Sequence, residues 1–112
     1  MILSEIVAEL GLKVLAGGDA LNREVTGGYA GDLLSDVMAN SQKGHLWVTL
    51  QGHVNVVAVG VLRELAGIVL IKDRTPAPDT LAKAQVEGLP ILQSSLHAFE
   101  LTGRLYTLLG AR

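Results

Sequence analysis

Hydrophobic and polar residues follow one another along this chain in runs that predict strands and helices in turn. The most informative stretch, 45–71, contains apolar runs over 45–50 and 67–71 that are typical of buried strands. The run between them is rich in valine, which favours a strand. A strand would mix charged and apolar residues on both faces, whereas a helix would gather one apolar stripe, so periodicity favours a helix. That stripe comprises Val54, Val57, Ala58, Val61, Leu62 and Leu65. The stretch is therefore predicted to be a strand–helix–strand unit.

The first forty residues predict two helices and two strands. Residues 3–10 have helical apolar spacing, with Ser4 placed to cap the start and Gly11 to end the helix. Residues 12–16 suggest a strand. Residues 23–31 suggest an extended strand whose glycines permit either a bulge or the close approach of another backbone. Asp32 is placed to cap a helix that runs to about residue 40.

The last forty residues predict a helix, a short strand and a final helix. The first helix spans 79–87, with Pro78 in its first turn and Gly88 at its end. A strand follows over 89–92, and Ser94 or Ser95 caps the final helix. The inner stripe of that helix comprises Ala98, Leu101, Thr102, Leu105, Leu108 and Leu109. The expected fold is α/β: a single domain over 1–112, with three layers and a mostly parallel sheet of about five strands covered by helices on both faces.

The amino-acid composition limits the kinds of partner that this chain is expected to bind. Apolar residues make up 49% of the 112 residues and charged ones 18%, which leaves more apolar surface than a small core hides and predicts a homodimer or higher homo-oligomer. A net charge of −2 with four aromatic residues argues against nucleic-acid binding. Polar residues interrupt the uncharged run at 44–62, so we expect no membrane span. Glu5 and Glu9 near the start argue against a signal peptide, and a cytoplasmic location is expected.

The chain carries no recognisable catalytic signature. It has no cysteine, no P-loop sequence and no dinucleotide-binding glycine pattern. Its three histidines fall in different predicted elements, so neither a metal site nor a cofactor is expected. Two serine pairs, Ser35 with Asp36 and Ser94 with His97, are neighbours of the kind that any helix start produces. The sequence therefore predicts a protein that is not an enzyme.

A candidate ligand site lies where the predicted strands end. In open α/β sheets ligands bind at the carboxyl ends of the strands, and free amides at a helix start favour an anion. Arg74 follows the next strand and can hold a phosphate group. The predicted site for a small anionic ligand such as a nucleotide comprises Thr49, Gln51, Gly52, His53 and Arg74. Polar neighbours in the same loops are Asp73, Thr75, Gln93, Ser94 and Ser95; ordinary solvent-facing loops are the alternative interpretation.

A second motif carries a family resemblance. The residues Asn22, Arg23, Thr26, Gly27 and Gly28 resemble the pattern that names the DRTGG domain, with asparagine in place of the aspartate. The likeness extends over nearly the whole chain. Such domains occur beside CBS modules in regulated pyrophosphatases and in long phosphotransacetylases, and they are similar to the N-terminal domain of HPr kinase/phosphorylase. The resemblance implies a non-catalytic regulatory or dimerisation module.

The residues of this motif also suggest a structural role without reference to any family. Glycines in a strand allow a bulge or close packing, and Arg23 and Thr26 would then pin that backbone or a partner subunit. The resulting hypothesis is a regulatory and oligomerisation module that binds a small anion. The alternatives are an interaction module that recruits a metabolic enzyme, and an enzyme with an unrecognised site.

Overall fold

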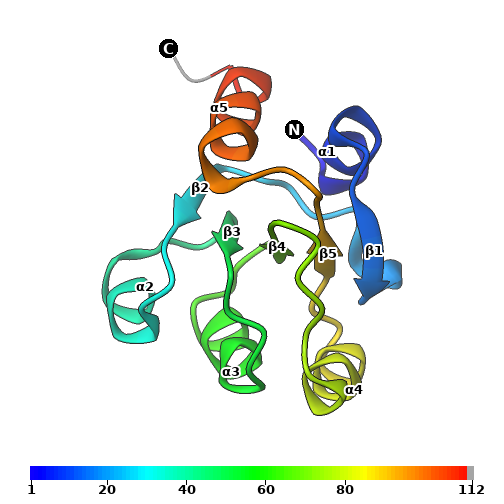
Figure 1. Ribbon diagram of the computed structural model, residues 1–112, viewed down its shortest axis with the longest axis vertical. Helices are drawn as coiled ribbons and strands as arrows, with labels where there is room; N and C mark the ends of the chain where they lie inside the picture. Colours follow the sequence, from blue (N-terminus) through cyan, green and yellow to red (C-terminus); the bar gives the residue numbers. More distant parts are fainter. Residues whose placement is uncertain (111–112) are drawn as a thin grey trace.

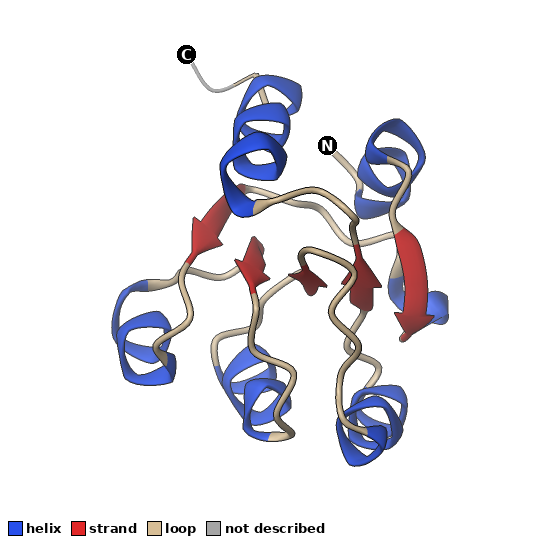
Figure 2. Ribbon diagram, in the orientation of Figure 1, coloured by secondary structure: helices blue, strands red, loops and turns tan. Residues whose placement is uncertain are grey.

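A computed structural model describes residues 1–110 as a five-stranded sheet between two layers of helices (Figures 1 and 2). The strands are β1 (Lys13–Ala16), β2 (Gly27–Ala30), β3 (His45–Thr49), β4 (Gly67–Leu70) and β5 (Ile91–Gln93). Their order is β1-β5-β4-β3-β2; β1 runs antiparallel to β5, and all other pairs are parallel. The predicted α/β class and mostly parallel sheet are confirmed.

Two helices cover one face of the sheet and three cover the other (Figure 1). The first layer holds α1 (Leu3–Leu10) and α5 (Ala98–Leu108). The second holds α2 (Leu34–Asn40), α3 (Asn55–Leu62) and α4 (Pro78–Glu87). A single 3₁₀ turn, η1 (Gly18–Ala20), follows β1. The predicted three-layer arrangement is therefore confirmed.

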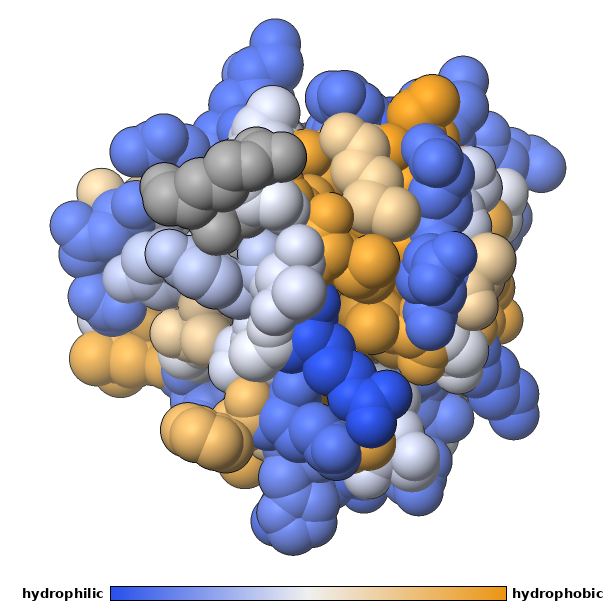
Figure 3. Space-filling model, turned by 90° about the horizontal axis from the view of Figure 1, so that it is seen from above, coloured by the Kyte–Doolittle hydropathy of each residue, from blue (hydrophilic) through white to orange (hydrophobic). Residues whose placement is uncertain are grey.

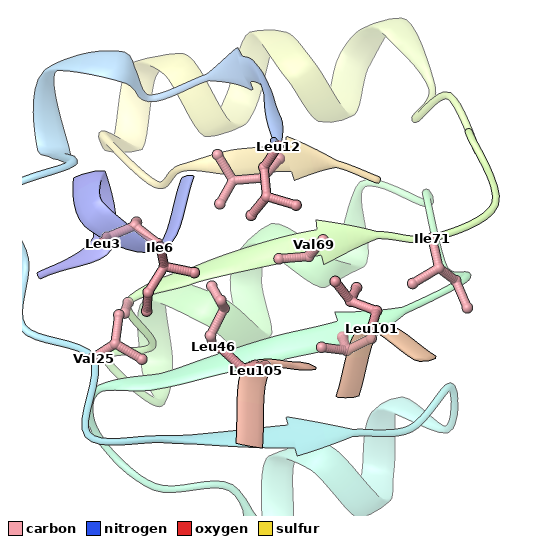
Figure 4. Packing of buried hydrophobic residues seen from close by; sticks show 12 residues of the cluster. Leu3, Ile6, Leu12, Val25, Leu46, Val69, Ile71, Leu101 and Leu105 are labelled. Carbon is pink, nitrogen blue, oxygen red and sulfur yellow. The ribbon is translucent and has the colours of Figure 1, made fainter. Parts of the chain in front are cut away.

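Each helical layer has its own hydrophobic core. Leu3 and Ile6 of α1 and Leu101 and Leu105 of α5 are buried against residues of the sheet that include Leu46 (Figure 4). On the other face the core is built around Trp47, which is fully buried. Both faces of β3 and β4 are covered, which explains their unbroken apolar sequences.

The predicted helix over 54–65 exists as α3, but its predicted buried stripe is wrong. Val57, and Leu65 beyond the end of α3, are buried as expected, whereas Ala58, Val61 and Leu62 are exposed. The residues that α3 buries are Val56, Val57, Val59 and Gly60. Only Asn55 and Gly60 in this helix are not apolar, so its sequence has no polar face from which the outward side can be inferred.

The predicted helix ends agree with the structure better than the predicted N-terminal caps do. Gly11 and Gly88 end α1 and α4 in the left-handed conformation, as predicted, and Pro78 is the first residue of α4. The predicted caps at Ser4, Asp32 and Ser94 or Ser95 are wrong: the N-cap residues are Ile2, Leu33 and His97. Short polar side chains close loop turns as readily as they cap helices, and Ser94 Oγ accepts a hydrogen bond from the Leu96 amide in this way.

The glycine-containing strand β2 is regular. Gly27 to Ala30 pair in sequence with His45 to Val48, so the predicted bulge is wrong. The alternative, a close approach of another backbone, is also wrong, because the atoms nearest to these glycines belong to side chains. A Cβ atom on Gly27 would lie 3.2 Å from the His45 ring, and one on Gly28 would lie 3.2 Å from Leu105 Cδ2. The predicted strand over 89–92 also begins two residues later than expected.

Candidate ligand-binding site

The loops that follow β3 and β4 pack directly against each other. The carbonyl oxygen of Gly52 accepts hydrogen bonds from the Ala77 amide (3.1 Å) and from Thr80 Oγ1 (2.7 Å). A Cβ atom on Gly52 would lie 3.0 Å from Pro76 Cα. Gly52 is therefore the residue that allows the two loops of the predicted site to meet.

Thr49 and Gln51 are engaged within the protein. Thr49 is 1% exposed, and its hydroxyl donates to Asp32 Oδ1 (2.9 Å) and accepts from the Gln51 amide (3.1 Å). Asp32 Oδ1 also accepts from the Leu50 amide (2.8 Å), while the Gln51 side-chain amide donates to the Asp32 carbonyl (3.2 Å). These contacts tie the end of β2 to the end of β3. They also explain why Asp32 caps no helix.

His53 and Arg74 face solvent at the same edge of the sheet. His53 Nδ1 accepts from the Asn55 amide (3.1 Å) and so closes the first turn of α3. The Arg74 guanidinium has no hydrogen bond or ion pair within residues 1–110. The backbone of its loop is held firmly, because the Lys72 and Asp73 amides each donate 2.9 Å bonds to the carbonyls of Leu96 and Ser94.

The Arg74 loop has an unusual backbone. Lys72 and Asp73 have φ values of 56° and 55°, a left-handed conformation that residues other than glycine adopt rarely. Such conformations concentrate at functional sites. Gln93 stabilises the loop by donating its side-chain amide to the Arg74 carbonyl (3.0 Å). Lys72 and Arg74 are thus exposed on a fixed loop whose next residues, Thr75 and Pro76, pack on Gly52.

The family-motif residues lie at the opposite, amino-terminal edge of the parallel strands. Arg23 donates to the carbonyls of Leu65 (3.2 Å) and Gly88 (2.8 Å). Thr26 Oγ1 donates to the Lys43 carbonyl (3.0 Å), and Gly44 packs so closely on Thr26 that a Cβ atom there would lie 2.6 Å from the hydroxyl oxygen. Arg23 and Thr26 therefore join segments of the chain, which agrees with the structural role predicted for them from their residue types. Asn22 is exposed.

A cleft of about 590 Å³ opens between these motif residues and the ends of α3 and α4. Its walls carry Arg23, Glu24, Thr26, Lys43, Gly44, Gly60, Val61, Glu64, Leu65, Ala66, Glu87 and Leu89. Three carboxylates face two cations here, and Arg23 is already engaged with backbone carbonyls. The cleft is large enough for a small molecule, but its charge does not favour an anion. Sequence reasoning missed the cleft, because its walls come from segments that only the fold brings together.

Tyr29 and His45 form a stacked pair beside the motif. Their ring centroids lie 6.4 Å apart with an interplanar angle of 15°. The Tyr29 hydroxyl donates to Asp36 Oδ2, which raises the pKa of Tyr29. Burial lowers the pKa of His45, whose Nδ1 accepts from the Gln42 amide (3.1 Å). Asp36 is thus bonded to Tyr29, and the neighbouring Ser35 takes no part in this cluster.

No three His, Cys, Asp or Glu side chains among residues 1–110 come together in a way that could hold a metal ion. Nor does any helix in this range combine the length and the apolar character needed to cross a membrane.

Comparison with known proteins finds similarity of structure alone. No protein-family model matches the chain, and no curated protein is similar to it in sequence. Among solved structures, it is similar to the CBS and DRTGG domains of the regulatory region of Clostridium perfringens pyrophosphatase, in complex with the activator diadenosine tetraphosphate. The TM-score is 0.69 at 10% sequence identity, and the match covers 93% of this chain. The chain spans less than half of that protein, since the match covers 45% of it.

Proposed function

We propose that this chain is a non-catalytic regulatory module of the DRTGG type, located in the cytoplasm, that binds a small anionic ligand such as a nucleotide and associates with copies of itself. The structural similarity to a pyrophosphatase regulatory region supports this class, and the activator bound to that region suggests adenine nucleotides as the first ligands to test. The observation that carries the ligand proposal is Arg74, an exposed guanidinium without a partner in residues 1–110 on a loop that packs against Gly52.

The five residues of the proposed site would have different roles. Arg74 would hold a phosphate group bidentately, and the exposed His53 ring and the amides near Gly52 would add donors beside the start of α3. Thr49 and Gln51, already bonded to Asp32, would hold the loop in position without touching the ligand. Gly52 would act through its packing on Pro76. Substituting Gly52 is a poor test of binding, since any side chain there would disturb the loop itself.

Nucleotide titration tests this proposal. Diadenosine tetraphosphate and ATP would be added to the protein while thermal unfolding and calorimetric heat are recorded. A ligand at a hundred times its dissociation constant stabilises the fold by about 2.7 kcal/mol. Arg74→Ala should weaken binding by about 1.5–3 kcal/mol, the usual range for a hydrogen bond to a charged group. Lys13→Ala on β1 serves as the control, because Lys13 is an exposed cation that lines neither candidate site.

Two outcomes would redirect the proposal. If Lys43→Ala abolishes binding while Arg74→Ala does not, the ligand occupies the cleft at the family motif. If neither nucleotide changes the stability of the unsubstituted protein, the nucleotide proposal fails. The module would then be better explained as one that recruits a metabolic enzyme through a protein surface.

A further inference from the structure

The outward face of α5 carries two exposed aromatic side chains. Phe99 is 92% exposed and Tyr106 is 65% exposed, and Gly103 lies between them at helical spacing on the same side. This side is opposite Leu101 and Leu105, which anchor the helix in the core. Figure 3 views the side of the molecule on which α1 and α5 lie and shows a hydrophobic patch there that hydrophilic residues border. We call Phe99, Gly103 and Tyr106 the α5 crest.

Nothing among residues 1–110 requires glycine at the centre of the crest. The backbone of Gly103 is ordinary helix, and a Cβ atom built on it would meet no atom within 4 Å. Glycine inside a helix destabilises it relative to alanine, so an exposed helical glycine has a cost without an internal benefit. A second helix packing closely on the crest would provide that benefit, because the distance between two helix axes depends on the side chains at the contact.

The spacing of the side chains around Gly103 is self-complementary. Phe99 and Tyr106 lie at equal distances on either side of the peptide bond between Thr102 and Gly103. A second α5 running antiparallel across this point would therefore place each Phe99 opposite the partner's Tyr106. The same operation brings Glu100 opposite residue 105 of the second copy, one residue from that copy's Arg104. Aromatic pairs and opposite charges both stabilise such a contact.

Glu100 and Arg104 pair with each other within one chain, and both side chains are exposed enough to pair with a second copy instead. Within one chain Arg104 Nη2 lies 3.1 Å from Glu100 Oε2, and the two side chains are 57% and 53% exposed. In a two-fold antiparallel pair of helices, the same flank of each helix lies beside its counterpart, so both intermolecular pairs form on one side of the crest. A groove of about 770 Å³ runs along this flank between α5 and α1, and Leu10 and Leu108 contribute apolar lining to it.

We infer that the partner of this surface is a second copy of the same chain, bound through α5 packed antiparallel on α5 with Gly103 near the two-fold axis. This inference rests on the self-association in the proposed function and assigns it to a particular surface. One helix and its flanks make a small interface, so a reversible dimer is expected.

Charge reversal with rescue tests the arrangement. Sedimentation equilibrium at about 100 micromolar should give a dimer for the unsubstituted protein, a concentration chosen to exceed a micromolar dissociation constant. Glu100→Arg alone and Arg104→Glu alone each set like charges across the two-fold and should give monomers. An equimolar mixture of the two variants restores opposite charges at both contacts and should give a heterodimer. Lys83→Glu is the matched control: it disrupts another exposed i,i+4 pair, with Glu87 on α4, and should leave the dimer intact.

Cross-linking provides a second readout. Because the chain has no cysteine, Gly103→Cys introduces a single thiol near the proposed axis, and oxidation should link two chains. Lys83→Cys should remain a single chain under the same conditions. Circular dichroism of each variant confirms that it is folded. If the unsubstituted protein is dimeric but the mixed variants remain monomeric and Gly103→Cys does not cross-link, α5 is not the interface. A monomer at about 100 micromolar would overturn both this inference and the proposed self-association.

Discussion

The Arg23 guanidinium donates a 2.8 Å hydrogen bond to the carbonyl oxygen of Gly88, and a second bond of 3.2 Å reaches the carbonyl of Leu65. Gly88 ends α4, so the cation lies where the helix dipole is negative. One side chain thus connects the segment before β2 to α4 and to the turn that precedes β4. The motif residue acts here as a structural connector.

Replacing Arg23 should therefore reduce stability. We expect Arg23→Ala to lower the free energy of unfolding by about 1.5–3 kcal/mol, the range for hydrogen bonds to a charged group. Arg23→Lys keeps the charge but cannot reach both carbonyls in the same geometry, so an intermediate loss is expected. Urea denaturation monitored by Trp47 fluorescence measures both changes. If the alanine variant is as stable as the unsubstituted protein, these hydrogen bonds make no net contribution to the free energy of unfolding.

The contact between Asp32 and Thr49 should be strongly coupled. Asp32→Ala removes the acceptor of a buried hydroxyl, which costs about 1–3 kcal/mol. Thr49→Val removes that hydroxyl, so the further loss on adding Asp32→Ala should be small. A double-mutant cycle by chemical denaturation measures the coupling. Independent, additive losses would mean that Asp32 stabilises the loop only through the Leu50 amide.

Two leucine substitutions on α3 test its corrected orientation. A Cβ atom at Gly60 would lie 2.7 Å from Leu89 Cδ2, so Gly60→Leu should overpack the core and cost about 1–3 kcal/mol. Ala58 is exposed two residues earlier, and Ala58→Leu should change stability by less than about 0.5 kcal/mol. Thermal and chemical unfolding of both variants measure the difference. A reversed order would restore the stripe that the sequence predicted.

His45 should make stability depend on pH near neutrality. Burial lowers its pKa below the ordinary value of 6.5, so below that value the unfolded chain binds the proton more readily than the folded one. The contribution is fully present above about pH 6.5 and is lost as the pH falls toward the lower pKa of the folded state. Denaturation curves between pH 7.5 and 5 should show this decline, and His45→Asn should reduce its slope. An unchanged slope would exclude His45 as its source.

The order and type of the elements could be predicted because turns and periodicity marked them locally. Gly11, Pro78 and Gly88 fixed helix boundaries through backbone conformations that other residues adopt poorly. The buried face of α3 could not be predicted, because a helix that is apolar on nearly every side offers no contrast. The predictions of the helix caps were wrong for another reason. Asp32 found partners at Thr49 and Leu50, which are distant in sequence and adjacent only across the sheet.

The meeting of the two loops that carry the candidate site was predictable from the sequence, but the contacts within them were not, and the site itself stays a prediction. The rule that ligands gather at the carboxyl ends of parallel strands brought Gly52 and Arg74 into one region, and the loops of these residues do meet there. Thr49 and Gln51 are both hydrogen-bonded to Asp32. These bonds were not predicted, because Asp32 was interpreted as a helix cap. The cleft at Arg23 and the crest on α5 required knowledge of which elements lie beside each other.

The antiparallel pairing of β1 with β5 also dictates an order of assembly. Lys13 pairs with Gln93, so β1 finds its sheet neighbour only after the three intervening strands and their helices have been made. Contacts between such distant segments slow folding, because the long loop between them must be ordered first. The parallel unit of β3, α3 and β4 involves shorter separations and can form earlier. During synthesis the apolar face of α1 must therefore wait for β5 and α5, which complete its core, and this interval is when a nascent copy is most open to capture by a chaperone or by a neighbouring chain.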